Sequence, residues 1–273
     1  MRKTTLLAGA VLLGSPGLAL AQNTAEENNP NIDAPFIRNI RADRPGQTIT
    51  AQVLRPGRFQ RETGFQRQSG GPGSAQRLSA ATLRIGFFNG MELRVRQPYF
   101  HNGPTVATET GNLSASGWSP AVVGAKFMLS PNYDTRTQVA ILAEAAVPGS
   151  GGAGLRQRGW APTARLLVSE QLGERFGLEG NFGFSQPGLT VADMEKGQFL
   201  GTLGLNGPIS ARTGFFVEAY GYGRQALSTG TTTGLYYRPV PGVRLDITAG
   251  RQLGGAATGT TTVGGGLTFK IGQ

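Results

Sequence analysis

From Arg58 onward the chain alternates apolar and polar residues in runs of roughly ten. Residues 91–96, for example, read Met-Glu-Leu-Arg-Val-Arg. Because successive side chains of a strand point to opposite faces, each run has one apolar face and one polar face. The number of runs predicts an antiparallel sheet of about twelve strands, an even number that suits a single-chain bacterial barrel.

The connections between these runs are expected to alternate between short and long. Short connections are expected at residues 89–90, 131–134, 173–174, 207–212 and 239–242, and long ones at 69–74, 101–118, 148–159, 186–195, 225–230 and 254–259. Tight turns on one rim and longer loops on the other are typical of an outer-membrane barrel. Lipid cannot hydrogen-bond the backbone of an open sheet edge, so such a sheet has to close. We therefore predict an all-β, antiparallel, up-and-down transmembrane β-barrel, with a soluble periplasmic β protein as the alternative.

The N-terminus differs from this pattern. Arg2 and Lys3 precede an apolar run at residues 6–13, and residues 19–21 read Ala-Leu-Ala, which fits a cleavage site. These features predict a secretory signal peptide over residues 1–21, cleaved after Ala21, because the run is too short for a spanning helix. Residues 22–57 are expected to form a periplasmic N-terminal segment, and residues 58–273 the barrel. Residues 33–57 either fold into or against the barrel mouth or form a flexible leader.

Composition supports a β fold and excludes several kinds of chemistry. The 43 glycines and 16 prolines are many for a helical protein. There is no cysteine, which removes disulfides, thiolate metal sites and cysteine nucleophiles. The formal net charge is +10, but the basic residues are scattered singly along the strands, and an exported chain is not expected to bind a nucleic acid.

We found no convincing active site in the sequence. His101 is the single histidine, no G-x-S-x-G element is present, and the acidic residues are scattered. We therefore assign no catalytic, cofactor-binding or metal-ligating residue and expect no cofactor. A lipid-modifying enzyme that uses His101 is the least favoured alternative.

The polar faces of the strands instead predict the lining of a lumen. The candidate lumen-lining residues are Glu62, Arg84, Glu92, Arg94, Arg96, Lys126, Arg136, Glu144, Arg165, Glu179, Glu218, Arg224, Arg244, Asp246 and Lys270. They either line a narrow channel with a mild preference for anions or form cross-strand ion pairs that fill the lumen.

Several segments resemble one known family. Residues 41–48 read Arg-Ala-Asp-Arg-Pro-Gly-Gln-Thr, and residues 55–65 read Arg-Pro-Gly-Arg-Phe-Gln-Arg-Glu-Thr-Gly-Phe. With segments at 216–221, 233–237 and 245–251, their order resembles a family of outer-membrane transporters named for the meta-pathway of phenol degradation. The resemblance implies a β-barrel with a transport role, and it supplies neither a substrate nor site residues.

These observations predict a barrel in the bacterial outer membrane that passes small solutes passively. The expected partners are outer-membrane lipid, the outer-membrane assembly machinery and small solutes, with aromatic and anionic solutes as candidates. The main alternative is a closed structural or adhesion barrel that transports nothing.

Overall fold

The computed structural model describes residues 40–271, apart from residues 45, 71–75, 103–104, 109–110, 115, 154, 158, 174, 187–196 and 225. The predicted signal peptide and the first part of the N-terminal segment, residues 22–39, lie outside the described residues. Within the described ranges, no helix is long and apolar enough to cross a membrane.

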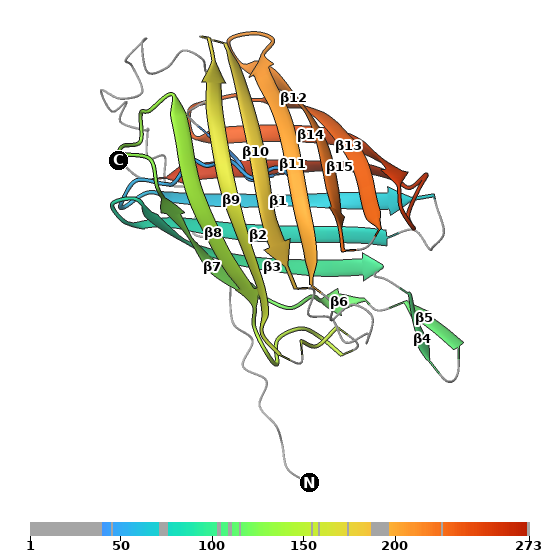
Figure 1. The fold of residues 1–273 in the computed structure, drawn as a ribbon. Coiled ribbons are helices and arrows are strands. Elements are labelled where there is room, and N and C mark those ends of the chain that lie inside the picture. Colours follow the sequence, from blue (N-terminus) through green and yellow to red (C-terminus); the bar gives the residue numbers. More distant parts are fainter. Residues whose placement is uncertain are drawn as a thin grey trace.

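Antiparallel strands form nearly all of the regular structure (Figure 1). They are β1 (Phe59–Ser69), β2 (Gln76–Phe88), β3 (Met91–Asn102), β4 (Thr105–Thr108), β5 (Gly111–Ser114), β6 (Gly117–Trp118), β7 (Val122–Met128), β8 (Thr137–Ala146), β9 (Ala161–Leu172), β10 (Phe176–Ser185), β11 (Gln198–Pro208), β12 (Thr213–Gly223), β13 (Leu227–Tyr237), β14 (Val243–Gly254) and β15 (Thr261–Ile271).

The main sheet closes on itself. It has 13 strands, in which β1 pairs with both β15 and β2 while β2 also pairs with β3. The short β6 only adds to the pairing of β3, and the other twelve strands form the wall of a barrel. The predicted fold class is confirmed. Closure leaves every strand of the wall with two neighbours, so the barrel has no free edge.

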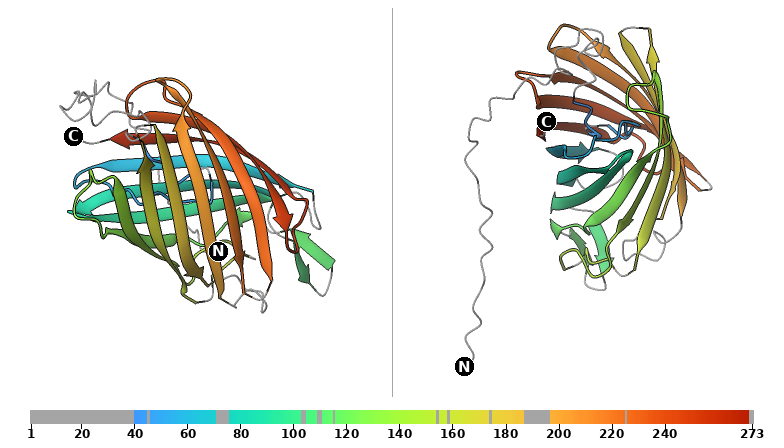
Figure 2. Two further views of the ribbon diagram at one scale, coloured as in Figure 1. Left: turned by 45° about the horizontal axis from the view of Figure 1, so that its top comes forward. Right: turned by 90° about the vertical axis from the view of Figure 1, so that its left-hand side faces the viewer.

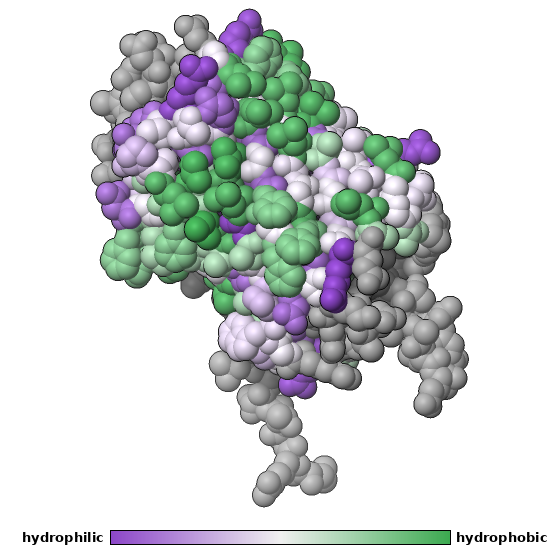
Figure 3. All heavy atoms as spheres, in the orientation of Figure 1, coloured by the Kyte–Doolittle hydropathy of each residue, from purple (hydrophilic) through white to green (hydrophobic). Residues whose placement is uncertain are grey.

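The two faces of the wall have opposite character. Glu62 and Arg84 on the inner face have no exposed surface, whereas the outward side chains of Phe65, Phe182 and Ile247 are 59%, 64% and 63% exposed. Figure 3 shows such hydrophobic side chains gathered over the strands on one outer face. A soluble sheet buries its apolar face. This inverted arrangement suits a barrel with lipid outside and polar groups within.

Two of the predicted connections differ from the structure. Residues 224–226 alone join β12 to β13, so the prediction of a long connection at 225–230 was wrong. The polar and glycine-rich composition there is typical of a loop, but Ser228 and Gly230 lie in β13 opposite Tyr222 and Tyr220, and the ring of Tyr220 lies over Gly230. The connection between β7 and β8, expected to be short, extends over residues 129–136. The long connection after β3 contains the separate β4–β5 hairpin.

Residues 40–57, here called the plug segment, run through the inside of the barrel (Figure 2). Ala51, Val53 and Leu54 are at most 5% exposed. Ile49, Ala51 and Val53 form one apolar cluster with the inward side chains of Ala140, Leu142 and Leu167. Of the alternatives for this part of the chain, the structure places residues 40–57 within the lumen.

Candidate functional site

Six charged side chains on β1, β2, β3, β7 and β8 cluster on the inner face of the barrel, and we call them the charged wall: Glu62, Arg84, Glu92, Arg94, Lys126 and Glu144. Arg84 donates to Glu92 through Nε and Nη2, both at 2.8 Å. Arg94 Nε donates to Glu144 Oε1 at 2.9 Å. Three cations therefore face three carboxylates, and the wall is electrically neutral without the plug segment.

The plug segment adds Asp43 to this cluster. Its carboxylate pairs with Arg94, with Lys126 at 3.3 Å and with Arg84 at 3.4 Å. Burial alone raises the pKa of Asp43, but the charges of Arg84, Lys126 and Arg94 together lower that pKa well below its ordinary value. Asp43 is therefore ionised at neutral pH and fixes the plug segment to one side of the barrel.

Side chains of the opposite strands hold the backbone of the plug segment. Ile49 donates its N–H to Asn181 Oδ1 at 2.7 Å, and Asn181 Nδ2 donates to the carbonyl of Ile49 at 2.7 Å. Glu218 accepts the N–H groups of Gln47 and Thr48 at 2.7 and 2.8 Å. The segment has no neighbouring strand to pair with, so these side chains satisfy backbone groups that would otherwise be buried without partners.

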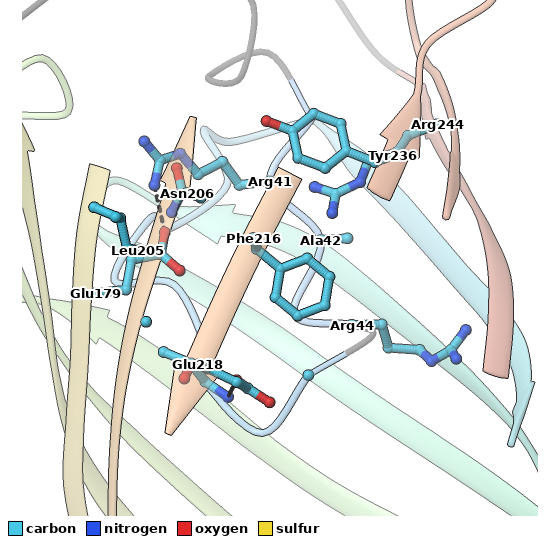
Figure 4. Close-up of a pocket in the computed structure, with 13 residues that line it drawn as sticks. Arg41, Ala42, Arg44, Glu179, Leu205, Asn206, Phe216, Glu218, Tyr236 and Arg244 are labelled. Carbon is cyan, nitrogen blue, oxygen red and sulfur yellow. Dashed lines mark hydrogen bonds and ion pairs between the residues drawn. The ribbon is translucent and has the colours of Figure 1, made fainter. Parts of the chain in front are cut away.

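A small cavity remains between the plug segment and strands β10–β14 (Figure 4). Its volume is about 50 Å³, which gives room for a few water molecules. Arg41 pairs with Glu179 across it, as the dashed line in Figure 4 shows. The guanidinium of Arg244 stacks on the ring of Tyr236, with 4.2 Å between its carbon and the ring centre. In this region the plug segment leaves little open lumen.

A larger polar cavity lies nearer the long loops, on the other side of the plug segment. It has a volume of about 200 Å³. We call it the loop-side cavity, and its lining includes Arg96, Glu144, Gln157, Thr163 and Arg165. These side chains come from β3, β8, β9 and the loop after β8, so the cavity depends on the closed barrel.

Most of the predicted lumen-lining residues point inward in the structure. Besides the charged wall, this group contains Arg96, Arg165, Glu179, Glu218, Arg244, Asp246 and Lys270. Arg136 and Arg224 do not point inward, so the prediction that they line the lumen was wrong. Arg136 precedes β8 and pairs with Glu170 at 3.3 Å, with 66% of its side chain exposed. Arg224 follows the end of β12 and is exposed, because it lies in the connection to β13 and not in the strand.

Several residues that hold the plug segment were not predicted from the sequence. Asn181 and Ser169 bind its backbone, and Leu142 and Leu167 pack against it. One signal was available. Leu142 lies at an inward position two residues before Glu144, and an apolar residue on a polar face indicates a packing partner inside the lumen.

His101 lies on the outer face of β3. Its Nε2 is 2.7 Å from Ser79 Oγ, and its ring meets Tyr99 edge to face with 4.9 Å between ring centres. Among the described residues, no carboxylate is hydrogen-bonded to the other ring nitrogen of His101. Within the described part of the chain, the pair has no acidic group of the kind that orients the histidine in a catalytic triad.

Comparison with solved structures shows the same fold. The COG4313 outer membrane channel from Pseudomonas putida F1 superimposes with a TM-score of 0.64 at 11% identity, covering 84% of this chain and 99% of that one. The NanC porin gives a TM-score of 0.54 at 11% identity, covering 77% and 100%. The KdgM porin, solved with a disordered oligogalacturonate, gives 0.53 at 8% identity, covering 76% and 98%.

No protein-family model matches the chain, and no curated protein matches it. The resemblance to the meta-pathway family therefore stays a prediction. The structural likeness shows that this chain has the fold of outer-membrane channel barrels.

Proposed function

We propose that this chain is a bacterial outer-membrane channel for small solutes and that its plug segment controls the bore. The observation that carries the proposal is the neutral charged wall. If the plug segment moves aside, Arg84 keeps Glu92 and Arg94 keeps Glu144 as partners. Uncompensated charge inside a protein is costly, so a wall that is already paired can line an open, wet bore.

The plug segment is held by contacts that can be broken locally. Its apolar contribution to the interior is five buried side chains, those of Ile40, Ile49, Ala51, Val53 and Leu54. The remaining contacts are hydrogen bonds and ion pairs, which water can replace when the lumen fills. Local opening of this segment is therefore expected to require less free energy than unfolding the barrel.

Residues 1–21 act as the export signal, residues 22–57 start from the periplasmic side, and the assembly machinery inserts the barrel into the outer membrane. The apolar outer face supports contact with lipid. We also propose membership of the meta-pathway transporter family, on the segments that resemble it. Aromatic and anionic solutes are the candidates for cargo.

A disulfide that fastens the plug segment to the wall tests the proposal. Thr50 Oγ1 and Ser169 Oγ are 3.5 Å apart, so two cysteines introduced at these positions would carry their sulfur atoms side by side. The chain has no cysteine of its own, so T50C/S169C forms one defined bond. We expect this variant to be silent in planar bilayers when oxidised and to conduct when reduced. The single variants T50C and S169C, under the same oxidant, are the controls.

Equal conductance of the oxidised and reduced double variant would show that the plug segment does not control the bore. A folded wild-type protein that is silent in bilayers and in liposome swelling, with or without reductant, would instead favour the closed structural or adhesion barrel.

The Ser79–His101 pair is a specific observation in favour of a second candidate, a lipid-modifying enzyme. The pair lies on the outer face, beside an open apolar hollow of about 790 Å³ that includes Phe65 and Trp118. Phospholipid hydrolysis by the purified protein, lost in both S79A and H101A, would support this function. The same rate of background hydrolysis in wild type and variants would exclude it.

A further inference from the structure

The loop-side cavity holds two arginines that lack a carboxylate partner among the described residues. Arg96 comes from β3 and Arg165 from β9, and both line the same space of about 200 Å³. The cavity lies on the side of the plug segment that faces the long loops, so a solute that enters between those loops meets it first.

Glu144 lines the cavity, but its charge is already engaged. Its carboxylate accepts from Arg94 Nε at 2.9 Å. The side chain reaches Arg94 by crossing Gly124 of β7, where a Cβ would lie only 2.5 Å from Glu144 Cγ. Glycine at this position thus lets the Glu144 side chain lie flat against β7 and reach Arg94. The cavity keeps a positive excess.

Arg165 is held in position yet keeps hydrogen-bonding capacity. Its stem lies over Gly183 of β10, where a Cβ would be 2.9 Å from Arg165 Cγ, and its Nη1 donates to the carbonyl of Gln47 at 3.4 Å. Its Nε is buried and has no hydrogen-bond partner within the described residues. A buried donor without a partner is unfavourable, and a ligand oxygen satisfies it once the guanidinium turns toward the cavity.

Arg96 provides the second donor group. It is exposed to the cavity, and no described residue forms a hydrogen bond or an ion pair with it. Neutral polar side chains share the lining, among them Thr163, whose hydroxyl is hydrogen-bonded to Ser185, and Gln157, whose amide donates to the carbonyl of Gly159. Guanidinium groups bind planar carboxylates strongly because their N–H donors match both oxygens.

We propose that the loop-side cavity binds a small organic carboxylate between Arg96 and Arg165. The inference deepens the proposed function, since it gives the channel a binding station for anionic solutes at its loop-side entrance. The cavity itself is formed without any movement of the plug segment, so binding does not depend on conduction.

Calorimetric titration of the purified full chain in detergent tests this site, with sodium benzoate as the probe and benzyl alcohol as its neutral counterpart. We expect benzoate to bind and benzyl alcohol to bind at least about tenfold more weakly, since a charge-assisted hydrogen bond supplies that difference. R96Q and R165Q should each weaken benzoate binding by about tenfold or more. R136Q, which alters the exposed arginine near β8, is the matched control and should bind like the wild type.

The site is excluded if benzoate and benzyl alcohol bind alike, or if R96Q/R165Q binds benzoate as the wild type does. R96Q is expected to fold, because no described side chain forms a hydrogen bond or an ion pair with Arg96. Heat-modifiable migration on a gel checks that the barrel of each variant is folded. Benzoate binding by a protein that never conducts would support the site while contradicting the channel. Conduction without benzoate binding would support the channel while contradicting the site.

Discussion

Two sides of the barrel interior are built from different chemistry. The charged wall on β1, β2, β3, β7 and β8 consists of ion pairs that also bind the plug segment. On β12 and β13 aromatic rings lie over glycines of the neighbouring strand, and we call this the aromatic wall: Phe216 over Gly234, Tyr220 over Gly230 and Tyr236 over Gly214. Charged side chains there are fewer, and two of them also touch the plug segment: Glu218 accepts from the backbone of Gln47 and Thr48, and Arg244, which stacks on Tyr236, donates to the carbonyl of Ile40 at 3.3 Å.

The difference indicates a division of tasks. Ion pairs are directional, so the charged wall can fix the position of Asp43 and of the backbone carbonyls that follow it. Rings that cover glycines fill space and let neighbouring strands lie close together, which stabilises the sheet without binding the plug segment. Changes in the charged wall should therefore release the plug segment, and changes in the aromatic wall should weaken the barrel.

Release of the plug segment can be measured with one introduced cysteine. Val53→Cys, here called the V53C reporter, introduces a thiol at a position that is 3% exposed, in a chain without other cysteines. Its rate of labelling by a water-soluble maleimide then follows the fraction of molecules in which the plug segment is open. Urea unfolding, followed by the mobility of the folded barrel on a gel, reports the stability of the barrel itself.

Lys126→Met should have the largest effect on the plug segment. Lys126 Nζ donates to the carbonyls of Thr50 and Gln52 at 2.9 and 3.2 Å and pairs with Asp43. Loss of this buried cation should weaken plug binding by about 3 kcal/mol, or roughly a hundredfold in the labelling rate of the V53C reporter. Barrel stability should change little, because the ion pair between Glu92 and Arg84 remains. Unchanged labelling would mean that the charged wall does not hold the plug segment.

Gly234→Ala should disturb the aromatic wall and lower the free energy of unfolding of the barrel by about 2 kcal/mol. A Cβ at Gly234 would lie 2.3 Å from Phe216 Cε1 and 2.5 Å from the carbonyl oxygen of Ile247. Gly201→Ala is the matched control, since its Cβ would meet only the carbonyl oxygen of Asn181, at 3.9 Å. Faster labelling of the V53C reporter when it also carries G234A would show that the two walls are coupled.

Ser169→Ala should have a smaller effect, about 1 kcal/mol on plug binding. Ser169 Oγ accepts the N–H of Ala51 at 2.9 Å, and alanine leaves that donor buried without a partner. The labelling rate of the V53C reporter should rise roughly fivefold, with unfolding of the barrel unchanged. A rise as large as that of K126M would mean that hydrogen bonds outside the charged wall dominate.

Acidification from pH 7 to pH 5 should have the smallest effect on labelling. The pKa of Asp43 is lowered in the folded state, so its contribution to plug binding is present above its unfolded pKa and is lost only as the pH falls through the folded one. Both values lie below this range. A clear rise in labelling at pH 5 would point to a different titrating group. Labelling rates need correction for the lower thiolate fraction at pH 5.

Alternation along the chain was sufficient to predict the number of wall strands and the two faces of the barrel. The reason is local: side chains alternate with period two, and a closed sheet in lipid requires one apolar face. The same argument placed Glu62, Arg84 and Glu92 inward. It failed for Arg136 and Arg224, because strand ends depend on turn geometry rather than on alternation.

The position of the plug segment was decided only by the tertiary structure. Ile49 meets Asn181 across 132 residues of sequence, and Asp43 meets three cations from three different strands. No local pattern encodes such contacts, since they depend on the register of twelve strands and on the width of the closed barrel. Within each strand, the sequence by itself determined which side chains face inward. The closed barrel determined which of them meet, because only closure brings distant strands around one lumen.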